Sequence, residues 1–242
     1  GLGNGDITVS SAITKSAGGD ATLTLQAHRN ITVNADITST AGKLNLTLSA
    51  ANNAGSDLGG VQIADGVSLK SNGGNILLGG GGGSKTTSQT NGIGFALNYS
   101  NTLPAISIGN LSKILSAGGN ITLNGYSSKA AAGNSNTTGI YVQARAVIDS
   151  GRYTNPADTS AASGGDINLT GQYVGGAGGN SNKVFGITID QGNGNNNQQT
   201  TISASKTTGS IYVFGSSTYD SLGEYALNMT TNGLAGNIFF NA

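Results

Sequence analysis

The acidic residues are the first place to look for chemistry in this sequence. The chain holds ten aspartates and one glutamate, Glu224. Cleavage of a glycosidic bond needs two carboxyl groups placed beside it, but Asp149 and Asp190, which end predicted strands, have no second acid next to them. His28 is the single histidine, in the polar turn AHRN, which argues against a histidine-dependent triad or a multi-histidine metal site. We therefore predict no catalytic residues and no enzymatic activity.

The remaining polar motifs predict turns instead of metal or cofactor sites. Asp6, Asp20 and Asp166 each precede a predicted strand, where aspartate commonly caps a turn. The stretch DQGNGNNNQQ, residues 190–199, lacks the spaced acids and final glutamate of a calcium loop. The stretch GGGGGS, residues 79–84, lacks the Gly-Lys-Ser/Thr and the helix of a phosphate-binding loop. We expect no bound metal and no cofactor.

Aromatic side chains offer the most plausible binding chemistry. The chain has eight tyrosines and five phenylalanines, and none precedes Phe95. A tyrosine that points outward presents a flat apolar ring on which a sugar or a peptide can stack. Some candidates alternate with inward aliphatic residues on strands, and others lie in the polar loops 149–159 and 216–223. The predicted ligand-binding residues are Tyr141, Arg152, Tyr153, Tyr212 and Tyr219. The alternative is that these tyrosines pack loops onto the body of the protein.

Short repeated strands would position these side chains. The sequence ITV at residues 7–9 recurs at 31–33, and LTL at 23–25 recurs at 46–48. Apolar and polar residues alternate within each piece, as in a strand with one buried face. Three such strands in about 23 residues fit one coil of a parallel β-helix, whose coils bury their apolar faces only when stacked. The residues expected to point inward include Ile7, Leu25, Ile31 and Leu48.

The repeat lengthens after the first third of the chain. GGNILL from Gly73 recurs as GGNITL from Gly118 and GGDINL from Gly164, then as TGSIYV from Thr208, with their third residues at steps of 45, 46 and 44. Between them lies a second series of strand-like pieces, which includes GIGFAL, GIYVQA and FGITID. We interpret each of these longer units as two coils.

The fold class predicted is therefore all-β, a right-handed parallel β-helix of about ten coils. We expect regular coils of 23–24 residues over 1–84 and decorated 45-residue double coils, with loop insertions, over 85–242.

The composition is consistent with one elongated domain over residues 1–242. Glycine contributes 41 residues, apolar residues make up 36% and charged residues 9%, and the net charge is zero. Disorder normally combines low hydrophobicity with high net charge. A chain with no net charge and scattered basic residues lacks the basic stripe that binds nucleic acid. The sequence contains no run of 18 apolar residues, so it predicts no membrane-spanning segment. Neither end resembles the cap of a β-helix, so we expect a monomeric fragment of a longer rod.

Two stretches carry a family resemblance. GGDATLTLQAHRNITVNADITSTAGKLNLTLSA, residues 18–50, and GVSLKSNGGNILLGG, residues 66–80, resemble the repeats of filamentous-haemagglutinin-like exoproteins. That family includes the high-molecular-weight adhesins and the stalks of contact-dependent inhibition toxins. The resemblance implies a Gram-negative bacterium, two-partner secretion, and a location outside the cell or on its surface.

The resemblance also implies an outer-membrane transporter as a partner, which would act on an amino-terminal secretion domain. The Asn-Pro-Asn motif of that domain is not matched by Asn155-Pro156-Ala157, so we expect this chain to lie beyond it. Family members are glycosylated at Asn-x-Ser/Thr triplets, and Asn136, in a polar loop, is the candidate site here.

Two functions remain open from the sequence. The first is an adhesin segment, a virulence factor for cell adhesion, that binds a host or matrix glycan or protein through residues 95–225. The second is a passive rod or stalk that displays a distal binding domain or toxin domain. The aromatic residues of the later coils favour adhesion, whereas the monotony and low charge of the repeat favour the rod.

Overall fold

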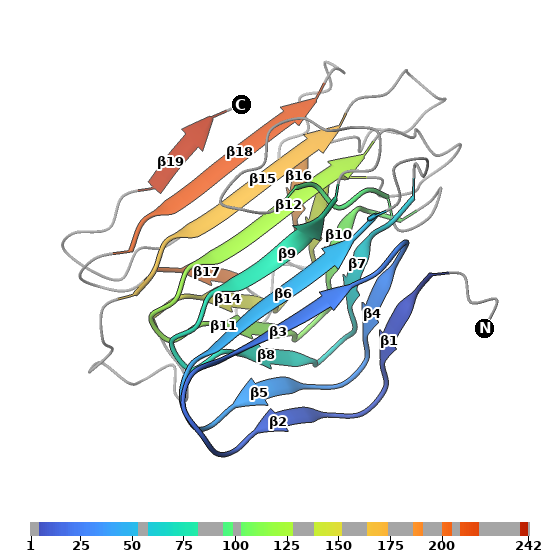
Figure 1. The fold of residues 1–242 in the computed structure, drawn as a ribbon. Coiled ribbons are helices and arrows are strands. Elements are labelled where there is room, and N and C mark those ends of the chain that lie inside the picture. The colour runs from blue at the N-terminus through green and yellow to red at the C-terminus, as the bar shows by residue number, and fades with distance from the viewer. Residues whose placement is uncertain are drawn as a thin grey trace.

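The computed structural model describes residues 5–52, 58–81, 94–98, 103–127, 138–151, 164–173, 186–190, 200–204, 209–217 and 238–241. These residues form strands and turns, and no helix occurs among them. The strands make three parallel sheets that surround one core (Figure 1). The chain is a parallel β-helix, as the repeat predicts.

Each sheet collects one strand from every coil. Sheet A contains β1 (Ile7–Val9), β4 (Ile31–Val33), β7 (Val61–Ile63), β10 (Ile106–Ile108), β13 (Ile140–Val142) and β16 (Ile187–Ile189). Sheet B contains β2 (Ile13–Lys15), β5 (Ile37–Ser39), β8 (Ser68–Lys70), β11 (Lys113–Leu115), β14 (Val147–Asp149) and β17 (Thr201–Ser203). Sheet C contains β3 (Ala21–Gln26), β6 (Leu44–Ala50), β9 (Ile76–Gly80), β12 (Ile121–Ser127), β15 (Ile167–Tyr173), β18 (Ile211–Ser217) and β19 (Ile238–Asn241).

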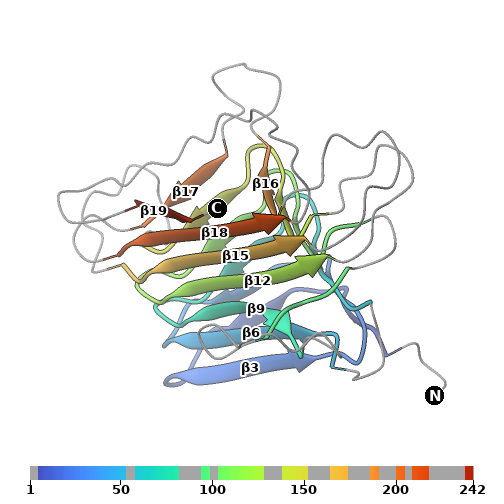
Figure 2. The ribbon, with the colours of Figure 1, turned by 90° about the horizontal axis from the view of Figure 1, so that it is seen from above.

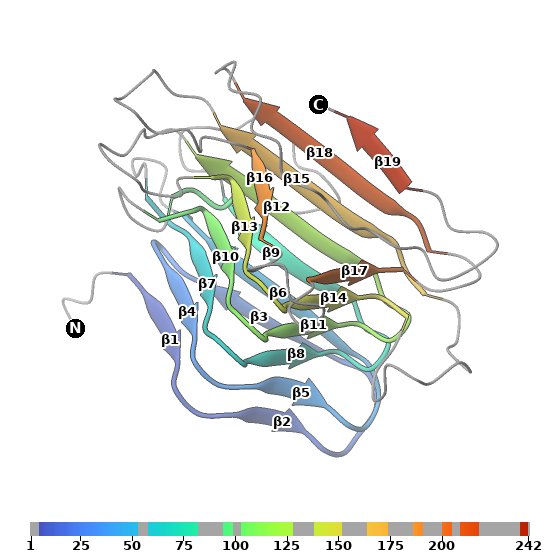
Figure 3. The same cartoon turned by 180° about the vertical axis from the view of Figure 1, so that it is seen from behind.

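The winding is right-handed. In Figure 1 the chain runs clockwise from sheet A to sheet B to sheet C, and the view from above in Figure 2 shows that later coils lie farther from the viewer of Figure 1. Figure 3 shows the strands of sheets A and B from behind. This is the hand that parallel strands joined by a crossover strongly prefer.

The described residues form six complete coils, and β19 adds a further strand to sheet C. The prediction of about ten coils is therefore wrong. Ile76 of β9 pairs directly with Ile121 of β12, and Ile121 pairs with Ile167 of β15. Because these partners are one long unit apart in sequence, a unit of about 45 residues forms one coil and not two.

The second series of strand-like pieces explains the error. GIYVQA and FGITID supply β13 and β16, which are the sheet A strands of the single coil. GIGFAL contains an additional short segment, in which Ala96 pairs with Gly125 and Gly94 pairs with Gly80. This segment lies against sheet C but forms no coil of its own.

The core consists of aliphatic side chains from all three sheets. Ile31 and Leu48 are fully buried, and Ile7 and Leu25 of the first coil are partly buried and pack against the same cluster. The inward orientation predicted for these four residues is confirmed.

A ladder of amide and carboxylate side chains links the coils where sheet C begins. Oδ1 of Asn45 accepts a hydrogen bond from the backbone N–H of Asn75 at 3.0 Å, and Asn75 accepts in the same way from Asn120 at 2.9 Å. Asn120 accepts from Asp166 at 2.8 Å, and Asp166 accepts from Ser210 at 2.9 Å. Each side chain therefore caps the corner of the next coil, which is the role predicted for Asp166.

A second ladder lies inside the corner between sheets B and C. Four serines in this ladder are nearly or fully buried: Ser39, Ser71, Ser116 and Ser150. The first three hydroxyls each donate to the carbonyl oxygen three residues later, and the hydroxyl of Ser150 donates to the oxygen of Gly165. The hydroxyl of Ser39, for example, donates to the oxygen of Gly42 at 2.8 Å. These bonds satisfy backbone acceptors that the tight turn would otherwise leave buried without a donor.

Candidate functional site

The outer face of sheet C carries an exposed aromatic residue near the end of the described coils. Tyr212 of β18 is 40% exposed, whereas Ile211 and Val213 on either side of it are buried. The alternation of a strand accounts for this, because successive side chains point to opposite faces of the sheet. The outward orientation predicted for Tyr212 is confirmed.

The register of β15 and β18 places polar residues around this tyrosine. Asn168 pairs with Tyr212 across the coils, Thr170 pairs with Phe214, and Asp166 precedes β15 as Ser210 precedes β18. Neighbouring coils are about 4.8 Å apart, and outward residues on one strand are about 6.6 Å apart. We call this surface the Tyr212 patch; its members are Asp166, Asn168, Thr170, Ser210, Tyr212 and Phe214. Apart from Tyr212, all of them are half-buried.

The patch ends abruptly at the preceding coil. Residues that pair from coil to coil form a column along the rod. Thr122 and Asn124 of β12 are in the same columns as Asn168 and Thr170, with which they pair, but they are 2% and 0% exposed. The accessible surface around Tyr212 therefore includes β15 and β18, which lie side by side in Figure 2, but does not continue onto β12. On its other side Tyr212 pairs with Phe239 of β19.

Tyr141 lies on a different sheet. It belongs to β13 of sheet A, points away from the buried Ile140 and Val142, and is half-buried. Its hydroxyl donates to Oδ2 of Asp190 at 3.2 Å. The structure therefore does not bring Tyr141 and Tyr212 together in one patch, although both point outward as predicted.

The other predicted site residues lie outside the described residues. These are Arg152, Tyr153 and Tyr219, together with the candidate glycosylation site Asn136. Of the two predicted loops, the described residues include only 149–151, at the end of β14, and 216–217, at the end of β18.

The two acids that end core strands are also separated. Asp149 ends β14 in sheet B and is 3% exposed; its Oδ1 accepts from the N–H of Gly151 at 2.7 Å, and its Oδ2 accepts from the hydroxyl of Ser203 at 2.6 Å. Asp190 follows β16 in sheet A and accepts from Tyr141. Asp149 and Asp190 lie on neighbouring coils but on different sheets.

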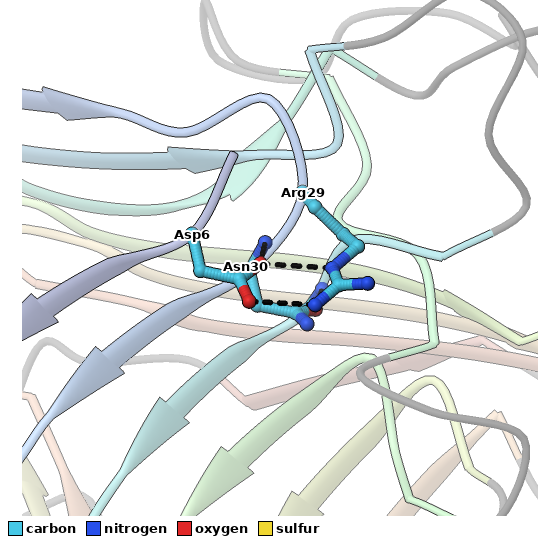
Figure 4. Close-up of polar contacts among 4 residues, drawn as sticks. Asp6, Arg29 and Asn30 are labelled. Carbon is cyan, nitrogen blue, oxygen red and sulfur yellow. Dashed lines mark hydrogen bonds and ion pairs between the residues drawn. The ribbon is translucent and has the colours of Figure 1, made fainter. Parts of the chain in front are cut away.

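The acid that begins the first described coil has a structural role. Asp6 accepts two hydrogen bonds from the guanidinium group of Arg29, at 2.9 and 2.7 Å, and one from the N–H of Asn30 at 3.0 Å (Figure 4). The hydrogen bond from Arg29 is the main reason why the pKa of Asp6 lies below its ordinary value, and burial opposes it. This ion pair joins the first two coils.

A small aromatic cluster covers the end of sheet C. Phe95 is 2% exposed and meets Tyr126 edge to face, with ring centroids 6.4 Å apart. Leu97 and Ala51 complete this cluster, which is separate from the main core. Phe95, the first aromatic residue of the sequence, is therefore buried in this second cluster and not in the main core.

Sequence reasoning found Tyr212 but missed its partners in the patch. The sequence predicted Asp166 as a turn residue and assigned no binding role to Asn168 or Thr170. The steps of 45, 46 and 44 already contain the missing signal, because they place Asn168 directly beside Tyr212 once each long unit is treated as one coil.

Two kinds of feature are absent from the described residues. No group of three or more histidine, aspartate or glutamate residues is arranged there to hold a metal ion. No helix of that part of the chain has the length and apolar character to cross a membrane.

Comparisons with known proteins do not extend these observations. No family model matches the chain, and neither a curated protein nor a solved structure matches it.

Proposed function

We propose that this chain is a segment of a secreted, surface-exposed bacterial adhesin that binds a host or matrix ligand through its later coils. The filamentous-haemagglutinin-like character of residues 18–50 and 66–80 supports export by the two-partner pathway of a Gram-negative bacterium. In this proposal the outer-membrane transporter acts on a secretion domain that lies elsewhere in the protein. The binding step involves no catalysis.

The observation that carries the proposal is the change in the outer face of sheet C along the rod. One line of outward positions, paired from coil to coil, begins with Thr24 and Thr47; its later members include Asn168 and the exposed Tyr212, which pairs in turn with Phe239 of β19. Stacking of the coils does not require an aromatic residue on the outer face of sheet C, because the aliphatic core already holds the coils together. An exposed ring beside amide, hydroxyl and carboxylate groups is typical of a recognition surface.

A direct binding assay tests the proposal. The purified chain, labelled at its amino terminus, is titrated onto cultured epithelial cells and onto immobilised matrix proteins. Saturable binding that unlabelled protein displaces is expected. Binding that stays linear in concentration on every surface would contradict the adhesin proposal.

The passive rod is the second candidate. Continuous inward columns and the two side-chain ladders favour it, since both features serve stacking alone. A rod segment would show no saturable binding but would keep a distal domain at a fixed distance from the cell. The same titration therefore separates the two candidates.

A further inference from the structure

We infer that the Tyr212 patch is a binding site for an uncharged glycan, with the sugar ring stacked on Tyr212 and its hydroxyl groups bound by Asp166 and Asn168. This inference rests on the proposed function and names the ligand class of the same surface. It assigns the site to β15 and β18 of sheet C and to none of the loops.

The aromatic ring supplies the apolar part of the site. Tyr212 stands on a flat strand surface with 40% of its area exposed, and Phe214 lies two residues farther along the same strand. The C–H groups on one face of a pyranose form a flat apolar surface that matches an exposed ring. Tyrosine presents this ring at low entropic cost, because it has two side-chain torsions.

The neighbours of Tyr212 supply hydrogen bonds of both kinds. One carboxylate oxygen of Asp166 accepts from the N–H of Ser210 and is fixed by it, while the second oxygen retains its accepting capacity. Asn168, directly across from the tyrosine, carries an amide that both donates and accepts. Adjacent hydroxyls of a sugar also donate and accept, so this pairing suits them better than it suits an apolar peptide.

The charge of the patch decides between glycan classes. Asp166 is the one charged member of the patch, and it is negative. The negative charge of a sulfated or carboxylated sugar would be repelled by this carboxylate, which lowers the affinity of the patch for acidic glycans. The surface therefore favours neutral sugars.

The spacing of the coils decides how the ligand lies. Coils repeat about every 4.8 Å along the rod, which is comparable to the length of one sugar unit in an extended glycan. The buried Thr122 closes the surface toward the earlier coils. The patch thus takes the terminal units of a glycan that lies along the rod axis above β15 and β18.

A glycan microarray with neutral and acidic oligosaccharides tests this inference. The proteins compared are the unaltered chain, Tyr212→Ala, Asn168→Ala and Asp166→Asn, with Thr47→Ala as the matched control in the same column of an earlier coil. Circular dichroism first verifies that each variant is folded. Asp166→Asn retains an amide oxygen for the ladder, as Asn120 does in the preceding coil, so it changes the charge without removing the corner bond.

The unaltered chain should bind neutral glycans, and Thr47→Ala should bind equally well. Tyr212→Ala should weaken binding about tenfold or more, because one stacked ring is a large part of a small site. Asp166→Asn should increase the relative signal from acidic glycans. Undiminished binding by a folded Tyr212→Ala, or binding of acidic glycans alone, would overturn the inference.

The cell assay separates this inference from the proposed function. Saturable cell binding that survives glycosidase treatment but is lost after protease treatment would overturn the glycan site and leave the adhesin proposal standing. Absence of saturable binding to cells and to the array would overturn both.

Discussion

Replacing Gly171 by alanine should destabilise the protein, whereas replacing Gly215 should not. The two glycines occupy the same place in the repeat, because Gly171 of β15 pairs in register with Gly215 of β18. A Cβ atom on Gly171 would lie well inside 3.0 Å of the oxygen of Gly186 and of Cγ1 of Ile187, closer than real Cβ contacts come. Among the described residues, and apart from its chain neighbours, a Cβ atom on Gly215 would come no closer than 3.9 Å to another atom.

The magnitude follows from what each methyl group meets. At Gly171 the obstacles are a backbone carbonyl and the branch of an isoleucine that packs against the core, and neither is the flexible end of a side chain. Overpacking of this kind costs about 1–3 kcal/mol. Neither glycine has a left-handed φ, so alanine at Gly215 brings no backbone strain and should add about 0.4–1 kcal/mol by restricting the unfolded chain. The two variants should differ by about 1.5–4 kcal/mol.

Urea unfolding followed by far-ultraviolet circular dichroism measures the difference. Because stacked coils couple mainly to their neighbours, hydrogen exchange should accompany it and locate the damage. Gly171→Ala should lower protection in β15 and β16 first and leave β3 and β6 unchanged. Equal unfolding midpoints for the two variants would show that sheet A does not approach sheet C as closely as the structure has it.

Three further predictions concern the core, the first ion pair and the serine ladder. Ile140→Asp places an unpaired charge among fully buried side chains, so it should cost about 3–5 kcal/mol, and unchanged hydrogen exchange in the adjacent coils would contradict this. Arg29→Gln should raise the pKa of Asp6, as measured by NMR titration. Because the pKa of Asp6 is lower in the folded protein than in the unfolded chain, the ion pair stabilises the fold above the unfolded pKa of about 4, and this stabilisation is lost as the pH falls through the folded pKa. Both side chains are about a third exposed, so solvent screening limits this pair to about 0–1 kcal/mol of stability, and an unchanged pKa would refute the assignment. Ser116→Ala should cost about 1 kcal/mol in urea unfolding, because a buried hydrogen bond is lost while the methyl group fits as Ala204 does in the last coil; no loss would show that the hydroxyl bond contributes nothing.

The inward columns of the fold could be predicted from the sequence because they depend on two simple periods. Alternation by two residues separates buried from exposed side chains, and a step of 24 residues stacks one coil on the next. The ITV pieces at residues 7–9 and 31–33 do pair residue for residue. This part of the prediction required no knowledge of contacts between residues far apart in the sequence.

The number of coils could not be predicted in the same way. A segment such as GIGFAL shows the same strand-like alternation whether it belongs to a coil of its own or is inserted beside another coil. The structure inserts it, since Ala96 pairs with Gly125 at the end of β12 while the main strand β9 still pairs with β12 at its start. The choice depends on contacts between distant parts of the chain, which alternation does not report.

The same limit applies to the candidate site. Alternation correctly predicted that Tyr141 and Tyr212 point outward, because that depends on neighbours within one strand. Which sheet each strand joins depends on its pairing with strands of the neighbouring coils, and this pairing places Tyr141 on sheet A and Tyr212 on sheet C. The partners of Tyr212 follow from register across coils, so they became visible only with the pairing of β15 and β18.

The corner between sheets C and A explains how successive coils stay in register although their connections differ. Gly125 and Gly171 lack a Cβ, which lets the carbonyl groups of Gly139 and Gly186 approach the end of sheet C as the chain returns to sheet A. Close contacts within the stack thereby fix the position at which the chain enters sheet A. The length of the connection between sheets C and A does not change this position. Connections can then differ in length and sequence from coil to coil while the inward columns stay in register. The aliphatic core, the ladders and the corner glycines thus hold the coils together, and outward positions such as Tyr212 can differ from coil to coil without disturbing them; Asp166 belongs both to a ladder and to the proposed glycan site.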